Sequence, residues 1–435
     1  DYSGTSVSSA GDVNGDGYAD MLIGAYYGDA GAPGSGETYV VFGKGSGFGS
    51  SVDLGALDGS DGFMLSGIDG NDQSGSSVST AGDVNGDGYA DILIGASGAD
   101  PDGDSSAGET YVVFGKGSGF AASVDLGSLN GTTGFMLTGI DASDNSGFSV
   151  STAGDVNGDG YADLLIGAMW ADPDGVFNAG ETYVVFGKED SFGSSVDLGA
   201  LDGSDGFVLT GIDANDNSGW SVSTAGDVNG DGYADILMGA WKADPGGDLS
   251  AGETYVVFGK SGSFGSSVDL SALDGTDGFV LTGIDADDRS GYSVSTAGDV
   301  NGDGYSDLLI GAPFADAGGS YSGETYVVFG KGSGFSASVD LGTLDGSDGF
   351  LLEGLDSDDW SGNSVSTAGD VNGDGYADIL IGMPYADPGG SGSGETYVVF
   401  GKSESFGASV DLSALDGSDG FLLEGIDATD YSGYS

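Results

Sequence analysis

The sequence contains no cysteine, no histidine and few basic residues. Of 435 residues, 8 are Lys or Arg and 70 are Asp or Glu, which gives a formal net charge of −62. Without cysteine or histidine, disulfide frameworks, zinc fingers and Ser-His-Asp triads are excluded. So acidic a chain cannot gain affinity for nucleic acid by releasing its counterions, and no apolar run is long enough to span a bilayer. The first residues do not read as a signal peptide.

The chain consists of six consecutive copies of one sequence repeat. The dipeptide Ser-Gly recurs in matching context at intervals of 71 or 72 residues, and DVNGDGY and GETYVVFGK each occur six times unchanged. A fixed period of this length is typical of repeat architectures. The predicted units span about residues 3–73, 74–145, 146–217, 218–289, 290–360 and 361–431, within a single domain of residues 1–435.

Each unit contains four short apolar blocks separated by Gly, Asp and Ser. In the second unit they are residues 76–82, 90–96, 109–115 and 134–140. Their length and their β-branched and aromatic content predict strands. The middle two are continuous apolar runs, which indicates burial on both faces. Four strands per unit favour an all-β fold, a β-propeller of four-stranded antiparallel blades, with six blades expected and seven as the alternative.

The turn between the first two strands carries oxygen donors at positions 1, 3, 5 and 9 of D-V-N-G-D-G-Y-A-D. Glycine at position 6 permits the left-handed backbone of a tight metal loop, and the carbonyl of the tyrosine at position 7 is expected to join the donors. Hard oxygen donors favour calcium, so we expect about six Ca²⁺ ions. An Asx-rich hairpin without metal is the alternative.

The predicted calcium ligands comprise five residues in each unit. They are Asp12, Asn14, Asp16, Tyr18 and Asp20; Asp83, Asn85, Asp87, Tyr89 and Asp91; Asp155, Asn157, Asp159, Tyr161 and Asp163; Asp227, Asn229, Asp231, Tyr233 and Asp235; Asp299, Asn301, Asp303, Tyr305 and Asp307; and Asp370, Asn372, Asp374, Tyr376 and Asp378. At ten to one hundred times its dissociation constant, each ion stabilises the bound protein by about 1.4–2.7 kcal/mol. Calcium is therefore expected to be a condition of folding.

The string SVSTAGDVNGDGYADILIGA, followed by a Gly-rich gap and ETYVVFG, resembles the FG-GAP repeat of integrin α-subunit propellers and their bacterial relatives. The resemblance covers all six units. It implies calcium in the hairpin between the first two strands of each blade. Two features depart from it: integrin propellers have seven blades, and here a segment of about 20 residues (43–62 in the first unit) joins the third and fourth strands. We expect this segment to dock onto the blade as a clip.

Sequence differences between units concentrate in the loops after the second and fourth strands. All four tryptophans fall there, and we consider them possible partner-binding residues: Trp170, Trp220, Trp241 and Trp360. The alternative is packing between blades. Six lysines follow Phe-Gly and are expected to balance neighbouring carboxylates. Acidic pairs such as Asp69 and Asp72 precede each Ser-Gly and are expected to lie in solvated loops.

These observations predict a calcium-binding structural or adhesion protein, secreted or on the cell surface and bacterial, that contacts other proteins or copies of itself. A carbohydrate-binding propeller that uses the aromatic loops is the alternative function. An enzyme is not expected: a carboxylate-pair glycosidase is the sole plausible chemistry, and its candidates, Glu353 and Glu424, occupy equivalent positions in two units. Neither a nucleic-acid partner nor a membrane span is expected.

Overall fold

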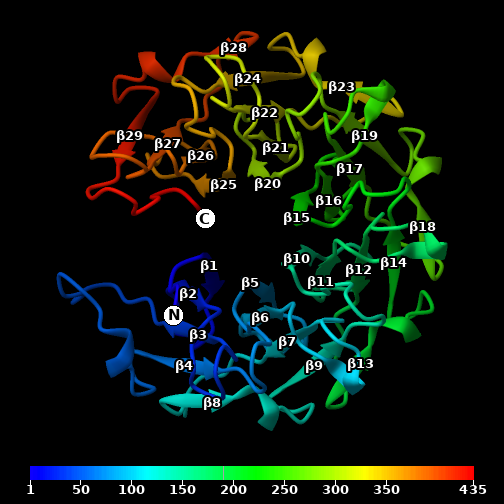
Figure 1. Ribbon diagram of the computed structural model, residues 1–435, viewed down its shortest axis with the longest axis vertical. Coiled ribbons are helices and arrows are strands. Elements are labelled where there is room, and N and C mark those ends of the chain that lie inside the picture. Colours follow the sequence, from blue (N-terminus) through cyan, green and yellow to red (C-terminus); the bar gives the residue numbers. More distant parts are fainter. Residues whose placement is uncertain (190) are drawn as a thin grey trace. The chain divides into compact units, whose positions relative to one another are not determined.

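The computed structural model describes residues 1–189 and 191–435. The chain is an all-β, six-bladed β-propeller, which confirms the predicted fold class and blade number (Figure 1). Its helical segments are 3₁₀ turns of three residues. No helix in the described ranges is long and apolar enough to cross a membrane.

Four strands form the antiparallel part of each blade and follow one another in chain order. The first strands are β1 (Ser6–Gly11), β5 (Ser77–Gly82), β10 (Ser149–Gly154), β15 (Ser221–Gly226), β20 (Ser293–Gly298) and β25 (Ser364–Gly369). The second are β2 (Asp20–Ala25), β6 (Asp91–Ala96), β11 (Asp163–Ala168), β16 (Asp235–Ala240), β21 (Asp307–Ala312) and β26 (Asp378–Met383). The third are β3 (Glu37–Val41), β7 (Glu109–Val113), β12 (Glu181–Val185), β17 (Glu253–Val257), β22 (Glu324–Val328) and β27 (Glu395–Val399). The fourth are β4 (Gly62–Ser66), β9 (Gly134–Thr138), β14 (Gly206–Thr210), β19 (Gly278–Thr282), β24 (Gly349–Glu353) and β29 (Gly420–Glu424).

Five of the sheets gain a short fifth strand from the segment that joins the third and fourth strands of the next blade. These strands are β8 (Ser123–Asp125), β13 (Ser195–Asp197), β18 (Ser267–Asp269), β23 (Ser338–Asp340) and β28 (Ser409–Val410). β8 pairs in parallel with β4, and Leu65 lies opposite Val124. The joining segment therefore clips the preceding blade rather than its own.

A 3₁₀ turn follows in the same segment of every blade: η1 (Leu54–Ala56), η3 (Leu126–Ser128), η5 (Leu198–Ala200), η7 (Leu270–Ala272), η8 (Leu341–Thr343) and η9 (Leu412–Ala414). The carboxylate of the preceding Asp caps it, as Asp125 does by accepting the Gly127 N–H. Three blades have a second turn after the second strand: η2 (Pro101–Gly103), η4 (Pro173–Gly175) and η6 (Pro245–Gly247).

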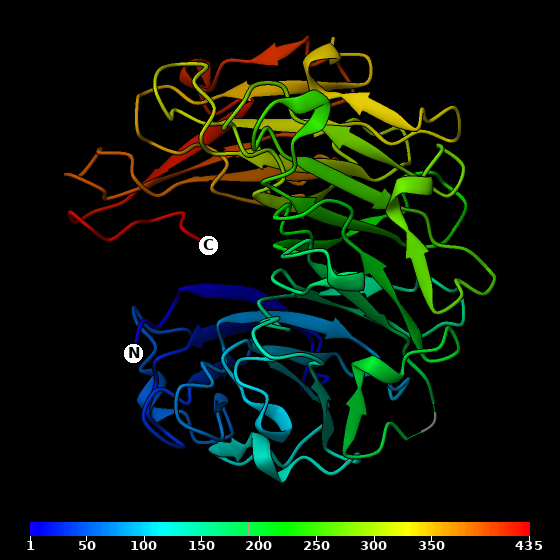
Figure 2. The ribbon, with the colours of Figure 1, turned by 45° about the vertical axis from the view of Figure 1, so that its right-hand side comes forward.

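The chain divides into two compact units. Unit 1 contains residues 1–155, 159–210 and 262–268, and unit 2 contains residues 156–158, 211–261 and 269–435. Within unit 1 the first strands β1, β5 and β10 are neighbours, and within unit 2 the same holds for β15, β20 and β25. Consecutive sheets of a unit thus lie side by side (Figure 2).

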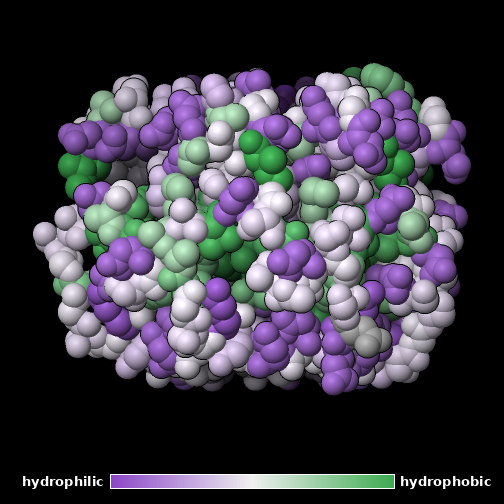
Figure 3. All heavy atoms as spheres, turned by 90° about the horizontal axis from the view of Figure 1, so that it is seen from below, coloured by the Kyte–Doolittle hydropathy of each residue, from purple (hydrophilic) through white to green (hydrophobic). Residues whose placement is uncertain are grey.

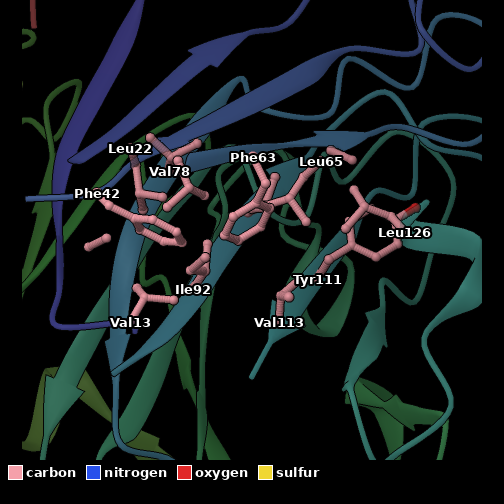
Figure 4. Packing of buried hydrophobic residues seen from close by; sticks show 14 of the residues in the cluster. Val13, Leu22, Phe42, Phe63, Leu65, Val78, Ile92, Tyr111, Val113 and Leu126 are labelled. Carbon is pink, nitrogen blue, oxygen red and sulfur yellow. The ribbon is translucent and has the colours of Figure 1, made fainter. Parts of the chain in front are cut away.

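The hydrophobic core lies between consecutive blades of each unit. The second strand β6 is buried at all six positions, as its continuous apolar run predicts. Between the first two blades, Leu22 and Phe63 pack with Ile92 and Tyr111, and Leu126 from the joining segment closes the cluster (Figure 4). Phe63 stacks on Phe120 with ring centroids 4.8 Å apart. The joining segment therefore contributes apolar side chains as well as a strand.

Candidate metal loops and the opposite loop face

The predicted metal loop joins the first and second strands and curls around its own acceptor side chains. In the second blade, Asp83 accepts the backbone N–H groups of Gly86, Asp87 and Gly88 at 2.7–3.1 Å. Asn85 accepts the N–H of Asp87 at 2.8 Å, and Asp87 accepts that of Tyr89 at 3.1 Å. Positions 1, 3 and 5 of the loop thus lie along one tightly wound backbone.

The aspartate at position 9 has a different environment. Asp91 begins β6, is fully buried, and accepts the Gly115 N–H at 2.9 Å and the Val84 N–H at 3.0 Å. Burial raises the pKa of its carboxyl to about 8, and the neighbouring Asp87 and Asp83 add to the rise. This residue ties the loop to the end of the third strand. No local sequence pattern indicates this second role.

A loop that is followed by another blade of its unit also contacts that blade, as the first loop shows. The Asp12 carbonyl accepts the Ala90 N–H at 3.1 Å, and the Val13 carbonyl accepts the Lys116 N–H at 3.0 Å. The Tyr89 ring covers Gly15, which has φ +72°, so closely that an added Cβ would lie 2.4 Å from the Tyr89 Cε1. The tyrosine at position 7 therefore has a packing role besides the predicted carbonyl donation. Successive loops within a unit are physically linked.

The donor chemistry of these loops fits a hard cation. Asp16 is exposed and Asp12 and Asn14 are half-buried, and each side-chain oxygen retains lone pairs beyond those that its N–H partners use. Across the described residues, no three acidic side chains converge into a group that could hold a metal. A calcium site would therefore draw on the amide of Asn14 and on backbone carbonyls as well as on carboxylates.

The lysines that follow Phe-Gly lie over aromatic rings. The Nζ of Lys116 is 4.9 Å from the centroid of Phe120, and equivalent pairs recur along the chain. In the described ranges, ion pairs within 4 Å are Lys188–Asp205 and Lys260–Asp277, both at 3.7 Å. Among these lysines, contact with a phenylalanine ring is thus more frequent than the ion pair with a carboxylate that the sequence predicts.

Four of the acidic pairs before Ser-Gly differ from expectation, because their second member is buried, whereas Asp359 is half-buried and Asp430 is exposed. Asp72, Asp144, Asp216 and Asp288 are 6–8% exposed. The Asp72 carboxylate accepts the Asp69 N–H at 3.1 Å, which permits its burial. Burial raises the pKa of Asp144, Asp216 and Asp288 to about 7, and nearby carboxylates contribute. These residues are part of the structure of the loops rather than solvated charges.

The strand registers place the loops after the second and fourth strands at the edge opposite the metal loops. In β2–β3 and β3–β4, Ala25 lies opposite Glu37 and Glu37 opposite Ser66. In unit 2 these loops bring aromatic rings together in one series, and we call seven of them the aromatic strip. They are Trp220, Trp241, Tyr292, Phe314, Trp360, Tyr385 and Tyr431. The centroid of an eighth ring, Tyr321, lies 5.8 Å from that of Phe314.

Three of the four predicted partner-binding tryptophans belong to the aromatic strip. Trp220 and Trp241 have ring centroids 5.2 Å apart, and Trp360 lies 4.7 Å from Phe314. The fourth, Trp170, belongs to unit 1 and is 43% exposed. Trp241 is only 8% exposed, so part of its role is packing.

The FG-GAP repeat model matches the chain six times, at residues 3–41, 74–113, 146–185, 218–257, 290–328 and 361–399. The matches together cover more than half of the sequence. Each runs from the Ser-Gly before the first strand through the metal loop to the end of the third strand, or within one residue of it.

Several curated proteins share this region. The phosphatidylinositol-glycan-specific phospholipase D of Dictyostelium discoideum is 28% identical over 300 residues, which are 65% of this chain and 29% of that protein. Its Bos taurus counterpart is 33% identical over 177 residues, 40% of this chain and 20% of that protein. Integrin alpha-PS2 of Drosophila melanogaster is 31% identical over 191 residues, 43% of this chain and 13% of that protein. The matched region spans less than a third of each of these relatives, and by its six matches the chain belongs to the FG-GAP repeat family.

Proposed function

We propose that this propeller is a calcium-dependent structural and adhesion module that binds one Ca²⁺ ion in each blade. The ligands would be the side chains at loop positions 1, 3, 5 and 9 and the carbonyl at position 7. The observation that carries the proposal is the conformation of the loop. Its side-chain acceptors are held close to one short stretch of backbone by hydrogen bonds from that backbone, and loop carbonyls accept N–H groups of the next blade. Hard oxygen donors on a short loop suit calcium.

The adhesive part of the proposal rests on the family and on the scaffold. Integrin alpha chains are among the relatives, and the six blades repeat the same surface with small variations. Such a surface suits contacts with other proteins or with further copies of the chain at a cell surface or in a matrix. We place the protein outside the cell, on a bacterium, because millimolar calcium is available there. We assign it no catalytic role.

Calcium stoichiometry tests the metal sites. Full-length protein, freed of calcium and titrated by calorimetry, is expected to bind about six ions. Asp87→Ala removes the donor at position 5 of one loop and should lower the number by one. Asp202→Asn changes an exposed aspartate outside the loops and should leave it unchanged. Absence of calcium binding, or six ions in Asp87→Ala, would contradict the proposal.

The aromatic strip supports a second candidate function, carbohydrate binding on the face opposite the metal loops. Its rings are mostly half-buried, so one side of the series faces solvent. Tyrosine and tryptophan supply rigid apolar contact area with a polar edge, which suits sugars. A glycan array in calcium and in EDTA tests this function. Loss of sugar binding in Trp220→Ala and Trp241→Ala, with circular dichroism unchanged, would support it, and an array without any bound glycan would reject it.

A further inference from the structure

Two basic residues of unit 2 lie outside the repeated Phe-Gly-Lys position. They are Lys242, in the loop after β16, and Arg289, in the loop after β19. Arg289 is the single arginine of the chain. Both loops belong to the edge that carries the aromatic strip. Positive charge is thus concentrated at one place on this face of an otherwise strongly acidic protein.

Aromatic rings hold both cations. The Arg289 guanidinium carbon lies 3.9 Å from the Phe314 ring centroid and 4.7 Å from that of Trp241. The Nζ of Lys242 is 4.6 Å from the Trp241 ring centroid. Both cations therefore lie beside the same indole ring. Burial lowers the pKa of Lys242, and the charge of Arg289 lowers it further. Stacking fixes the direction of the planar guanidinium, which leaves its edge for an acceptor.

No carboxylate of the described chain neutralises this pair. The ion pairs within 4 Å involve Lys188 and Lys260, and neither Arg289 nor Lys242 has one, although the sequence holds 70 acidic residues. The Arg289 Nε and the Trp241 Nε1 are buried and have no hydrogen-bond acceptor within the described residues. Two adjacent unpaired cations repel each other, and buried donors without acceptors are costly. An anionic ligand at this place would offset the repulsion between the two cations.

The rings around the cations suit a sugar. From Trp241 the strip continues through Tyr292 and Phe314 to Trp360 and Tyr385, with neighbouring centroids 4.4–6.0 Å apart. The C–H face of a sugar ring packs well on such surfaces. A polyanion would be repelled by the net charge of −62, whereas a single carboxylate is repelled far less. The site therefore favours an isolated acid group on a mainly neutral ligand.

We propose that Arg289 and Lys242, with the rings of Trp241 and Phe314, bind a uronic acid residue of an otherwise neutral glycan. The carboxylate accepts from the guanidinium and the ammonium group, and the neighbouring neutral sugars lie along the aromatic strip. This inference rests on the proposed carbohydrate-binding function and adds its specificity. Arginine matches the planar geometry of a carboxylate, which makes it the main determinant.

Matched disaccharides test the proposal. Each pair consists of a disaccharide with a terminal uronic acid and its neutral hexose counterpart, titrated into the full chain in calcium. We expect at least one acidic member to bind at least tenfold more tightly than its neutral partner. Arg289→Gln should abolish this preference, and Lys242→Met should reduce it. The Gln side chain suits the backbone, because Gln73 occupies the equivalent position of the first blade with φ 60°, as Arg289 does.

Lys402→Met is the matched control, since this lysine lies over Phe406 in a Phe-Gly-Lys repeat and should not affect binding. Equal binding of acidic and neutral sugars, or a preference that survives Arg289→Gln, would overturn the specificity while leaving carbohydrate binding intact. Binding of an oligo-aspartate peptide in place of every disaccharide would overturn the choice of a glycan. Binding of no probe would overturn the inference, whereas the glycan array tests carbohydrate binding in general and calorimetry tests calcium.

Discussion

At the scale of single residues, the loops at the aromatic edge bury several carboxylates. Asp216 is 7% exposed, and burial is the main cause of its raised pKa of about 7. The nearby Asp213 and Glu253 add to this rise, and a hydrogen bond from the Asp213 backbone offsets it only in part. The folded state thus holds a proton on Asp216 over a range in which the unfolded chain has lost it.

This proton predicts a pH dependence of stability. Because the folded pKa of Asp216 is raised from 3.8 to about 7, its contribution is fully present below about pH 4 and falls as the pH rises through 7. Asp216→Asn removes this dependence, so the variant should gain stability relative to the wild type between about pH 4.5 and about pH 8. Urea unfolding in calcium-free buffer measures the difference.

Asp202→Asn provides the control. Hydrogen bonds from Ser204 lower the pKa of this exposed carboxyl below its ordinary value of 3.8. It is therefore ionised in the folded and unfolded states across the whole window, and its variant should differ from the wild type by the same amount at about pH 4.5 and about pH 8. If the difference in unfolding free energy between the wild type and Asp216→Asn is the same at about pH 4.5 and about pH 8, the assignment of the bound proton to Asp216 is refuted.

At the scale of structural elements, the joining segment packs on the blade before it. Leu126 of η3 is 2% exposed and belongs to the cluster between the first two blades. Its counterpart in the first blade, Leu54 of η1, is only half-buried. The same residue in the same turn therefore occupies two environments.

This pair of leucines allows a matched comparison. Leu126→Ala removes buried methyl groups and should lower the free energy of unfolding by about 2–5 kcal/mol. Leu54→Ala should cost clearly less, because less apolar surface leaves water in the folded state. Urea unfolding of both variants in calcium measures the difference. Equal losses would show that the segment stabilises its own blade instead.

The sequence was sufficient to predict the main strands but not the partner of the joining segment. Continuous apolar runs such as residues 90–96 marked β6 to within one residue, because two-sided burial requires an apolar residue at every position. β8 has three residues and pairs with a strand 59 positions earlier (Leu65 lies opposite Val124), a contact that no local pattern encodes. Arg289 was missed as a site for the same reason, since its rings come from different loops.

The packing role of the metal-loop tyrosines also escaped prediction. A tyrosine at position 7 is compatible with many roles, and only the register of neighbouring blades brings Tyr89 onto Gly15. The oxygen donors at fixed spacing, by contrast, could be identified from sequence, because the chemistry of a cation loop lies within nine consecutive residues.

At the scale of the whole molecule, the charge of −62 opposes compaction. Hydrophilic atoms cover much of the face in Figure 3, with apolar patches between them. Few lysines are available to offset the carboxylates, so self-repulsion acts throughout the surface. Cations from solution must therefore contribute to stability, whether bound in loops or spread around the protein.

Salt should consequently stabilise the calcium-free protein. Raising NaCl from about 0.1 M to about 1 M shortens the Debye length from about 10 Å to about 3 Å and should raise Tm in EDTA. The increase should be smaller in saturating calcium, because bound ions already neutralise part of the charge. Differential scanning calorimetry in the four conditions measures this. A Tm that is insensitive to NaCl in EDTA would show that repulsion is unimportant for this fold.

The strand that a blade adds to the preceding sheet also affects the order in which the sheets can be completed during synthesis. A ribosome releases β4 well before it releases β8, so the outer edge of the first sheet stays unsatisfied until some 58 further residues have left the tunnel. The next four sheets repeat this delay, and each of them is completed only when the following blade supplies its strand. We therefore expect the outer edges of these five sheets to be completed one after another in the direction of translation.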